Sequence, residues 1–270
     1  MEKFTLITGA TGGLGNAFAY EFAKLGHNLV LSGTNLAKLD NIANRIEQEY
    51  PNIKVLKFIC DLSDQQARLS FIEFLKENEV CVNYLVNNAG YIAEGLFLEH
   101  TDQEIIKVIR VNCEGTVDLT QKIIKIRDKS QELNIITVAS MAGYYPMPYM
   151  AIYASTKAML KNLMIAMHYE LKEQGVNITT ICPSGIPTSE AMKEAIKSQG
   201  LAGKITQSLP EQIAKIAIKA NKKKKAVVVP KCINKIILAI SNICGDKMLA
   251  KTTRRMWKKS YEKRQREGKL

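Results

Sequence analysis

A tyrosine and a lysine four residues apart are the pair in this chain best suited to proton transfer. Tyr153 and Lys157 bracket the segment Tyr-Ala-Ser-Thr-Lys, and helical residues at this spacing lie on one face. A nearby ammonium favours the phenolate and lowers the tyrosine pKa from its ordinary value of about 10. Such a tyrosine donates or accepts a proton near neutral pH. Because the same pair is frequent on solvated helices, its meaning depends on the rest of the chain.

A glycine-rich turn near the start of the chain is the second candidate for chemistry. It reads Thr-Gly-Ala-Thr-Gly-Gly-Leu-Gly from Thr8 to Gly15, after an apolar run and before a helix expected over Asn16–Leu25. Glycines let a backbone approach a pyrophosphate closely, and the free N–H groups of a helix N-terminus bind anions. A plain turn is the alternative, but the position between a strand and a helix favours nucleotide binding.

The elements that must position these residues alternate between short apolar runs and longer amphipathic stretches. The runs lack polar alternation, which is typical of parallel strands covered on both sides. Capping boxes predict helix starts at Ser63–Gln66, Thr101–Glu104 and Ser208–Glu211. We therefore expect an α/β fold, a doubly wound parallel sheet with helices on both faces. The expected strands are Phe4–Thr8, Asn28–Ser32, Ile53–Ile59, Tyr84–Val86, Asn134–Ala139, Asn177–Cys182 and Ala226–Val229.

Five further motifs follow the expected strands in order. They are Asp61-Leu62 after the third strand, Asn87-Asn88-Ala89-Gly90 after the fourth, Asn112 in the next helix, Ser140 after the fifth strand and Pro183–Thr188 after the sixth. Each alone is compatible with a turn, a helix cap or an exposed polar residue. Together with the glycine turn and the Tyr–Lys pair, they resemble the short-chain dehydrogenase/reductase family over residues 3–230. The pocket segment and the C-terminal region look most like its 3-oxoacyl and hydroxysteroid reductases.

The resemblance implies a Rossmann fold of about seven strands and an NAD(P)-dependent oxidoreductase acting on a carbonyl or a secondary alcohol. Tyr153 is then the general acid or base, and Lys157 lowers its pKa and binds the nicotinamide ribose. Ser140 donates to the substrate oxygen, and Asn112 holds a water that links Lys157 to solvent. The implied cofactor residues are Gly9, Thr11, Gly13, Leu14, Gly15, Thr34, Asn35, Asp61, Leu62, Asn88, Ala89, Gly90, Tyr153, Lys157, Pro183, Ile186 and Thr188.

The choice between NAD and NADP depends on the end of the second strand. An NAD site usually carries an acidic residue there, on the ribose 2′-hydroxyl. The chain has Gly33, Thr34 and Asn35 instead, which favours NADP, although the arginine that would hold a 2′-phosphate is also missing. Ser32, Thr34, Asn35 and Lys38 are the available substitutes. A second departure is Ser184, where the family usually has glycine; we expect a modest effect on cofactor affinity.

The segments around the expected pocket indicate the substrate class. Between Ser140 and Tyr153 the chain is rich in tyrosine and methionine and has no charged residue. We expect a catalytic domain over 1–230 with a lid at 189–207, which carries Lys193 and Lys197 beside apolar residues. These features favour an apolar acyl or sterol-like substrate on an anionic handle. Packing beneath the lid or at a subunit interface remains the alternative.

The C-terminal extension, 231–270, carries the positive charge of the chain. The net charge is +12, yet residues 222–270 hold 16 Lys and Arg against 3 acids, or +13, so the other 221 residues sum to −1. Isoleucines from Ile233 to Ile243 fall on one helix face, and Trp257 follows among cations. Three alternatives stay open: peripheral association with an anionic membrane, docking on the body or a second subunit, and nucleic-acid binding. The last is disfavoured because no base-reading motif accompanies the charge.

The remaining composition sets limits on other functions. Six cysteines are scattered without a CxxC motif, which predicts buried thiols in a reducing compartment. Three histidines lack ligand spacing, so no metal is expected. No long apolar run and no leader is present, so we expect a cytoplasmic protein, membrane-peripheral at most, and a dimer or tetramer as in the family. A dinucleotide-binding sensor or scaffold is the alternative function, and the intact set of catalytic residues argues against it.

Overall fold

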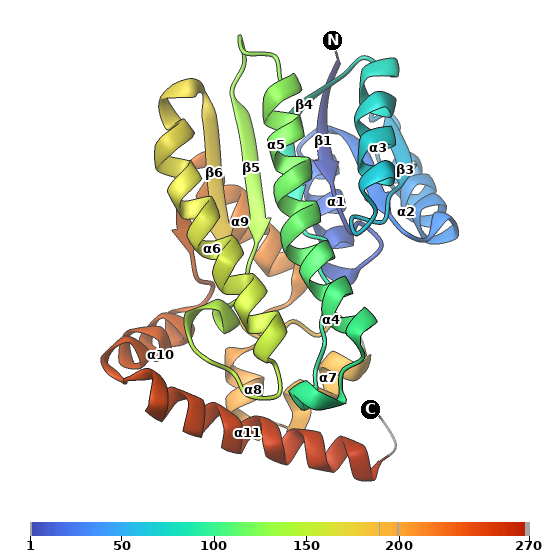
Figure 1. The fold of residues 1–270 in the computed structure, drawn as a ribbon. Coiled ribbons are helices and arrows are strands. Elements are labelled where there is room, and N and C mark those ends of the chain that lie inside the picture. Colours follow the sequence, from blue (N-terminus) through green and yellow to red (C-terminus); the bar gives the residue numbers. More distant parts are fainter. Residues whose placement is uncertain (1, 189, 199, 268–270) are drawn as a thin grey trace.

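Seven parallel strands form a single sheet at the centre of the protein (Figure 1). The structure is a computed structural model that describes residues 2–188, 190–198 and 200–267. The strand order is β3-β2-β1-β4-β5-β6-β7, so the direction of winding reverses between β1 and β4. Loops at the carboxyl ends of the strands diverge at such a reversal and leave a crevice there. The strands are β1 (Glu2–Ile7), β2 (Asn28–Gly33), β3 (Val55–Ile59), β4 (Val80–Asn87), β5 (Leu133–Val138), β6 (Val176–Ile181) and β7 (Val227–Val228).

Helices cover both faces of the sheet, as the sequence predicts. The apolar side chains of α1 (Gly13–Lys24), α2 (Leu36–Glu49) and α9 (Pro210–Lys222) pack on one face. Those of α3 (Gln65–Glu77), α5 (Thr116–Ile126) and α6 (Ala151–Leu171) pack on the other. The remaining helices are α4 (Asp102–Ile109), α7 (Glu190–Ser198), α8 (Gly200–Thr206), α10 (Cys232–Ile243) and α11 (Asp246–Arg266). Short helical turns lie at Phe97–Glu99, Arg110–Gly115, Met141–Tyr144 and Lys172–Gln174.

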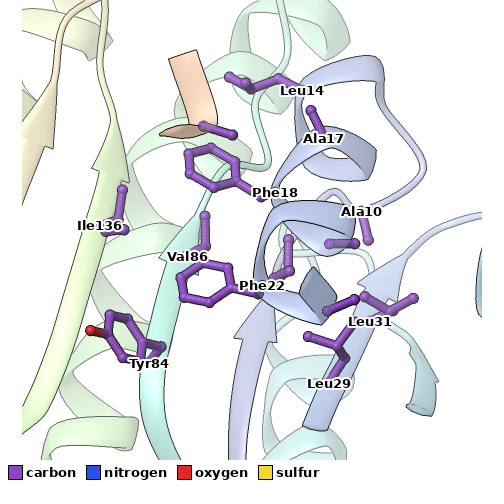
Figure 2. Close-up of a cluster of buried hydrophobic side chains, with 14 of the residues drawn as sticks. Ala10, Leu14, Ala17, Phe18, Phe22, Leu29, Leu31, Tyr84, Val86 and Ile136 are labelled. Atoms are coloured by element: carbon purple, nitrogen blue, oxygen red, sulfur yellow. The ribbon is translucent and has the colours of Figure 1, made fainter. Parts of the chain in front are cut away.

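The core beneath α1 explains why the strands lack polar alternation. Figure 2 shows Phe18 and Phe22 of α1 directed at side chains of the sheet, including Val86 and Ile136. All four side chains are fully buried. Residues on the opposite side of the same strands, such as Leu85, are buried under α5 and α6. A strand covered on both sides has no solvent face on which polar residues would be favoured.

Two of the three predicted capping boxes are wrong. The box at Thr101–Glu104 is confirmed, since each residue's side chain accepts from the other's backbone N–H. At the start of α3 the cap is Asp64 and not Ser63, whose hydroxyl donates to Asp61 instead. At the start of α9, the residue before Pro210 is Leu209, so Ser208 lies outside the capping position. At α3 the carboxylate of Asp64 accepts from the Gln66 N–H, whereas at α9 the capping position has no side-chain hydrogen bond and the helix begins with Pro210.

Other predictions hold with adjusted boundaries. Helix α1 begins at Gly13 and not at Asn16, because its glycines pack within the first turn. Four of the cysteines are buried thiols as expected, whereas Cys232 is exposed and Cys244 is half-buried. Within the described residues, no helix is long and apolar enough to cross a membrane.

Arg68 on α3 fixes the loop after β3 to α5. Its side chain is 2% exposed and donates to the Leu62 carbonyl at 2.6 Å. It also donates to Glu114 and Asp118, each at 2.7 Å. A guanidinium is suited to three such partners because its donors form a rigid planar fork. The loop that carries Asp61 and Leu62 is therefore held by a buried cation.

Replacing Arg68 should destabilise the protein strongly. We expect Arg68→Ala to lower the free energy of unfolding by about 3 kcal/mol, because it breaks a buried network and leaves a void. Arg110→Ala is the matched control, since Arg110 contacts Glu114 from an exposed position, and should cost less than about 1 kcal/mol. Urea unfolding followed by circular dichroism measures both. Equal losses would contradict the role assigned to Arg68.

Candidate active site

A cavity of about 640 Å³ lies where the loops after β1, β2, β3, β4, β5 and β6 converge. Most of the residues predicted from the motifs line it. They are Gly9, Thr11, Gly13, Leu14, Thr34, Asp61, Leu62, Asn88, Ala89, Gly90, Ser140, Tyr153, Lys157, Pro183, Ile186 and Thr188. Three predicted residues do not line the cavity: Gly15, Asn35 and Asn112.

The glycine turn after β1 leaves room for a ligand only because side chains are missing. Gly9 has a φ of +62°, which favours glycine. A Cβ on Gly15 would lie 2.2 Å from the carbonyl oxygen of Gly9, so Gly15 permits the turn to fold back on α1. A Cβ on Gly13 would lie 3.2 Å from the Thr188 side chain. The turn thus presents bare backbone at the N-terminus of α1, which is suited to a pyrophosphate.

The side chain of Asn88 ties this turn to the end of β4. Its amide donates to the carbonyls of Thr8 and Gly9 at 3.1 and 3.0 Å. The Thr8 hydroxyl in turn accepts from the backbone N–H groups of Asn88 and Ala89 and donates to Val86. Asn88 and Ala89 therefore support the turn structurally, in addition to lining the cavity.

The loops after β2 and β3 also line the cavity, with residues that lie far from Tyr153 along the chain. Asp61 accepts from the backbone N–H and the hydroxyl of Ser63 at 2.9 and 2.7 Å. Burial raises the pKa of Asp61, but these hydrogen bonds outweigh it and hold the pKa below its ordinary value. Asn35 accepts from the backbone N–H of Lys38 and caps α2. This cap is a structural role that the sequence reading missed.

The three residues of the proton-transfer group come from two elements that pack closely. Ser140 precedes the turn at Met141–Tyr144, and Tyr153 and Lys157 lie on α6. A Cβ on Gly143 would lie 2.7 Å from the backbone carbon of Lys157, so this glycine brings the turn against the helix. A side-chain hydrogen bond joins Tyr153 to Ser140. The Lys157 Nζ lies 5.8 Å from the centroid of the Tyr153 ring.

The charges in this group differ from the simple expectation. Burial raises the pKa of Tyr153, and the hydrogen bond with Ser140 only partly opposes that rise. Burial also lowers the pKa of Lys157 to about 8, while its ammonium donates to the Val138 carbonyl at 2.8 Å. The expected lowering of the Tyr153 pKa by Lys157 is not found here, because desolvation exceeds any attraction across that distance. At neutral pH the phenol is protonated.

Asn112 lies behind the cavity and joins two loops. It is fully buried in the π-helical turn at Arg110–Gly115. Its side chain accepts from the Tyr91 N–H at 2.7 Å and donates to the Tyr91 carbonyl and the Thr156 hydroxyl, each at 3.0 Å. The side chain thus positions the loop after β4 against α6. Its predicted role in holding a water stays a prediction.

Trp257 on α11 is a wall of the cavity that sequence reasoning did not find. Trp257 and Met256 line the cavity together with Tyr145, Met147 and Met150, residues of the segment that was expected there. Trp257 is 7% exposed and packs in one apolar cluster with Tyr149 and Tyr261. The available signal was the four- and three-residue spacing of Thr253, Trp257, Ser260 and Arg264, which places them on one side of a helix.

Polar contacts hold α11 against the body. The Thr253 hydroxyl donates to the Pro146 carbonyl at 3.0 Å. The Tyr261 hydroxyl donates to Glu99, and Arg264 forms an ion pair with Glu94. Of the alternatives left open for the C-terminal extension, docking on the body is therefore correct for α11.

Comparisons with known proteins place this geometry in context. Residues 3–201 match the family model described as short chain dehydrogenase. A very-long-chain 3-oxoacyl-CoA reductase-like protein of Arabidopsis thaliana is 34% identical over 69% of this chain, which spans only 60% of that protein. A 3-oxoacyl-[acyl-carrier-protein] reductase of Rickettsia conorii is 30% identical, covering 78% of this chain and 86% of its own. A short-chain dehydrogenase from Sphingobium yanoikuyae in complex with NADPH superposes with a TM-score of 0.75 at 25% identity, covering 86% of this chain and 89% of that one.

The buried ammonium of Lys157 should cost stability. Because its folded pKa of about 8 lies below the ordinary 10.5, the unfolded chain binds more protons between these values, and stability rises with pH across that window. We expect Lys157→Met to raise the Tm at pH 7 by about 2–4 °C and to have a smaller effect at pH 10. Differential scanning fluorimetry of the ligand-free protein at both pH values is the measurement. An equal shift at the two pH values would contradict the electrostatic cause.

Proposed function

Since the chain belongs to the short-chain dehydrogenase family, we propose that it transfers hydride between a nicotinamide cofactor and the carbonyl or secondary alcohol of an apolar acyl substrate. The observation that carries this proposal is one cavity with two kinds of lining. Bare glycine backbone suited to a pyrophosphate lies at one end. Ser140, Tyr153 and Lys157 lie beside an apolar wall that ends at Trp257.

The residues at the cofactor end support NADP over NAD. A nicotinamide cofactor supplies the hydride when bound. Of the described residues that line the cavity, Asp61 is the sole carboxylate, and it follows β3. Ser32, Gly33 and Thr34 line the end of β2 and present no negative charge. A 2′-phosphate would therefore meet hydroxyl groups without repulsion there, whereas an NAD site typically has an acid at this strand end.

Tyr153 is proposed to move the proton, and its protonation state favours reduction. Burial keeps the phenol protonated at neutral pH, which is the form that donates to a carbonyl oxygen. Ser140 is hydrogen-bonded to Tyr153 and is placed to donate to the same oxygen as negative charge grows on it. Lys157 carries an ammonium below about pH 8 and is positioned by its hydrogen bond to Val138. The proton lost by Tyr153 must then be replaced from solvent.

We propose 3-oxoacyl thioesters as the substrate class. The names of the relatives from Arabidopsis and Rickettsia both refer to 3-oxoacyl reduction. The wall of methionine, isoleucine and tryptophan is suited to an alkyl chain. A second cavity of about 410 Å³ shares Ile196 with the first and is lined by Lys193, Lys197 and Lys204. Lys193 is paired with Glu190 at 2.6 Å, and Lys197 and Lys204 are suited to the phosphates of a thioester carrier.

The proposal is tested first by turnover. We expect the protein to oxidise NADPH in the presence of a 3-oxoacyl thioester, with NADH as the weaker donor. Tyr153→Phe should lower kcat by at least ~100-fold, the usual scale for the loss of a general acid, while cofactor binding measured by fluorescence is retained. Cofactor binding without turnover of any carbonyl compound would favour the alternative of a dinucleotide-binding sensor or scaffold.

The proposed phosphate site in the second cavity is tested with two thioester substrates that share one acyl chain. For a coenzyme A thioester, Lys197→Glu with Lys204→Glu should raise KM by about 10-fold, the ratio that corresponds to 1.4 kcal/mol, and leave kcat unchanged. For the N-acetylcysteamine thioester, which has no phosphate, KM should not change. Lys219→Glu on α9 is the control because Lys219 is exposed and does not line the cavity. Equal increases in KM for both thioesters would contradict a phosphate site.

A further inference from the structure

The isoleucines of α10 form an exposed apolar ridge. Ile233, Ile236, Ile240 and Ile243 follow one another at spacings of three, four and three residues, so they share one side of the helix. Ile236, Ile240 and Ile243 are 55%, 57% and 88% exposed. Large apolar side chains in such a row are uncommon on a soluble surface and mark an interaction site. We call these four residues the α10 ridge.

The other side of α10 fixes the ridge toward solvent. Asn234 is fully buried and donates to the carbonyls of Thr206 and Pro230, each at 3.0 Å. Ile237 and Leu238 pack on the cluster that contains Val229. The helix therefore cannot turn its ridge inward without breaking these contacts. The sequence grouped Ile237 with the other isoleucines, but the structure separates it from them.

Cations lie at the start of α10 and on it, and continue along α11. From Lys231 to Lys259 the chain has eight Lys and Arg against one acid, Asp246. The cations are Lys231, Lys235, Lys247, Lys251, Arg254, Arg255, Lys258 and Lys259, all of them exposed. Helix α11 buries its side that carries Trp257 and presents the basic side outward. Helix α10 thus presents the apolar ridge, and the adjoining helix α11 presents a strip of cations.

We propose that the α10 ridge and the basic side of α11 dock on an anionic lipid bilayer. Apolar side chains that enter the interface together with cations that meet anionic headgroups are the pattern of a peripheral membrane helix. A second copy of this chain is a poorer occupant, because its own cationic strip would face this one. The docking surface does not depend on the proposed substrate.

The docking surface lies beside the cavity. Helix α11 crosses the carboxyl-end side of the sheet below α7 and α8 (Figure 1), and Met256 and Trp257 line the cavity from it. The same helix that faces lipid with its basic side therefore forms part of the cavity wall with its inner side. This placement would bring the cavity near the source of an apolar substrate. Because Trp257 is buried against the body, the proposed membrane contact does not include this side chain.

Vesicle sedimentation of the full chain tests the proposal. We expect binding to vesicles of phosphatidylcholine with about a third phosphatidylserine, and at least tenfold weaker binding to phosphatidylcholine alone. Ile236→Ser with Ile240→Ser should abolish at least nine-tenths of the binding. The matched control is Ile59→Ser with Ile109→Ser, two isoleucines that are exposed elsewhere and should leave binding unchanged. Equal binding by the ridge variant and the control would overturn the proposal.

A spectroscopic measurement separates lipid insertion from other outcomes. Trp257 is the single tryptophan of the chain, and its emission should not shift on vesicle binding because it is already buried. In a Trp257→Phe background, Ile240→Trp should show a blue shift with anionic vesicles. An unshifted Ile240→Trp emission would overturn insertion of the ridge. A dimer in solution that dissociates in the Ile236→Ser, Ile240→Ser variant would assign the ridge to a second copy and also overturn the proposal.

Discussion

The hydrogen bonds from Asn88 to the carbonyls of Thr8 and Gly9 are the interaction on which the site depends. They join the ends of β1 and β4, the two strands between which the winding of the sheet reverses. Gly9 and Gly15 have no side chains with which to hold the turn, so its support at the edge of the crevice comes from Asn88, from the Thr8 hydroxyl and from backbone hydrogen bonds such as that of Ala10 to Ser32. A turn that must present bare backbone to a ligand is therefore fixed from behind by an amide of the neighbouring strand.

In the proton-transfer group, too, residues behind the cavity hold the residues that line it. Gly143 brings the Ser140 turn against α6, and Asn112 links the loop after β4 to Thr156 on the same helix. The cost of this close packing is desolvation. It keeps Tyr153 protonated and makes the Lys157 ammonium unfavourable. A ligand that offers hydroxyl acceptors to Lys157 would offset part of that cost, so stability and ligand binding are linked at one residue.

The sequence predicted the sheet and the strand-end motifs well because both are local patterns. A buried parallel strand is read from its apolar run, and a motif after it must lie at the carboxyl edge. Roles that depend on competing neighbours were not predictable in this way. Asn35 caps α2, a role that was not predicted beside its expected cofactor contact, and Ser63 was assigned to a cap that Asp64 supplies. The choice between a membrane and the body as the surface met by Trp257 could not be made from the sequence, because nothing local to α11 identifies Tyr149 and Met150 as the side chains that it covers.

The place of Trp257 in the chain has a consequence for how the protein is made. Most of the cavity comes from residues before 190, whereas its wall at Met256 and Trp257 belongs to α11, which leaves the ribosome after the other described helices. Synthesis proceeds from the N-terminus, so the segments that form the sheet and its glycine turn are made before the segment that closes this side of the cavity. A nascent chain would hold the cofactor end before it can enclose a substrate. The cavity could then discriminate between substrates only after α11 has been synthesised.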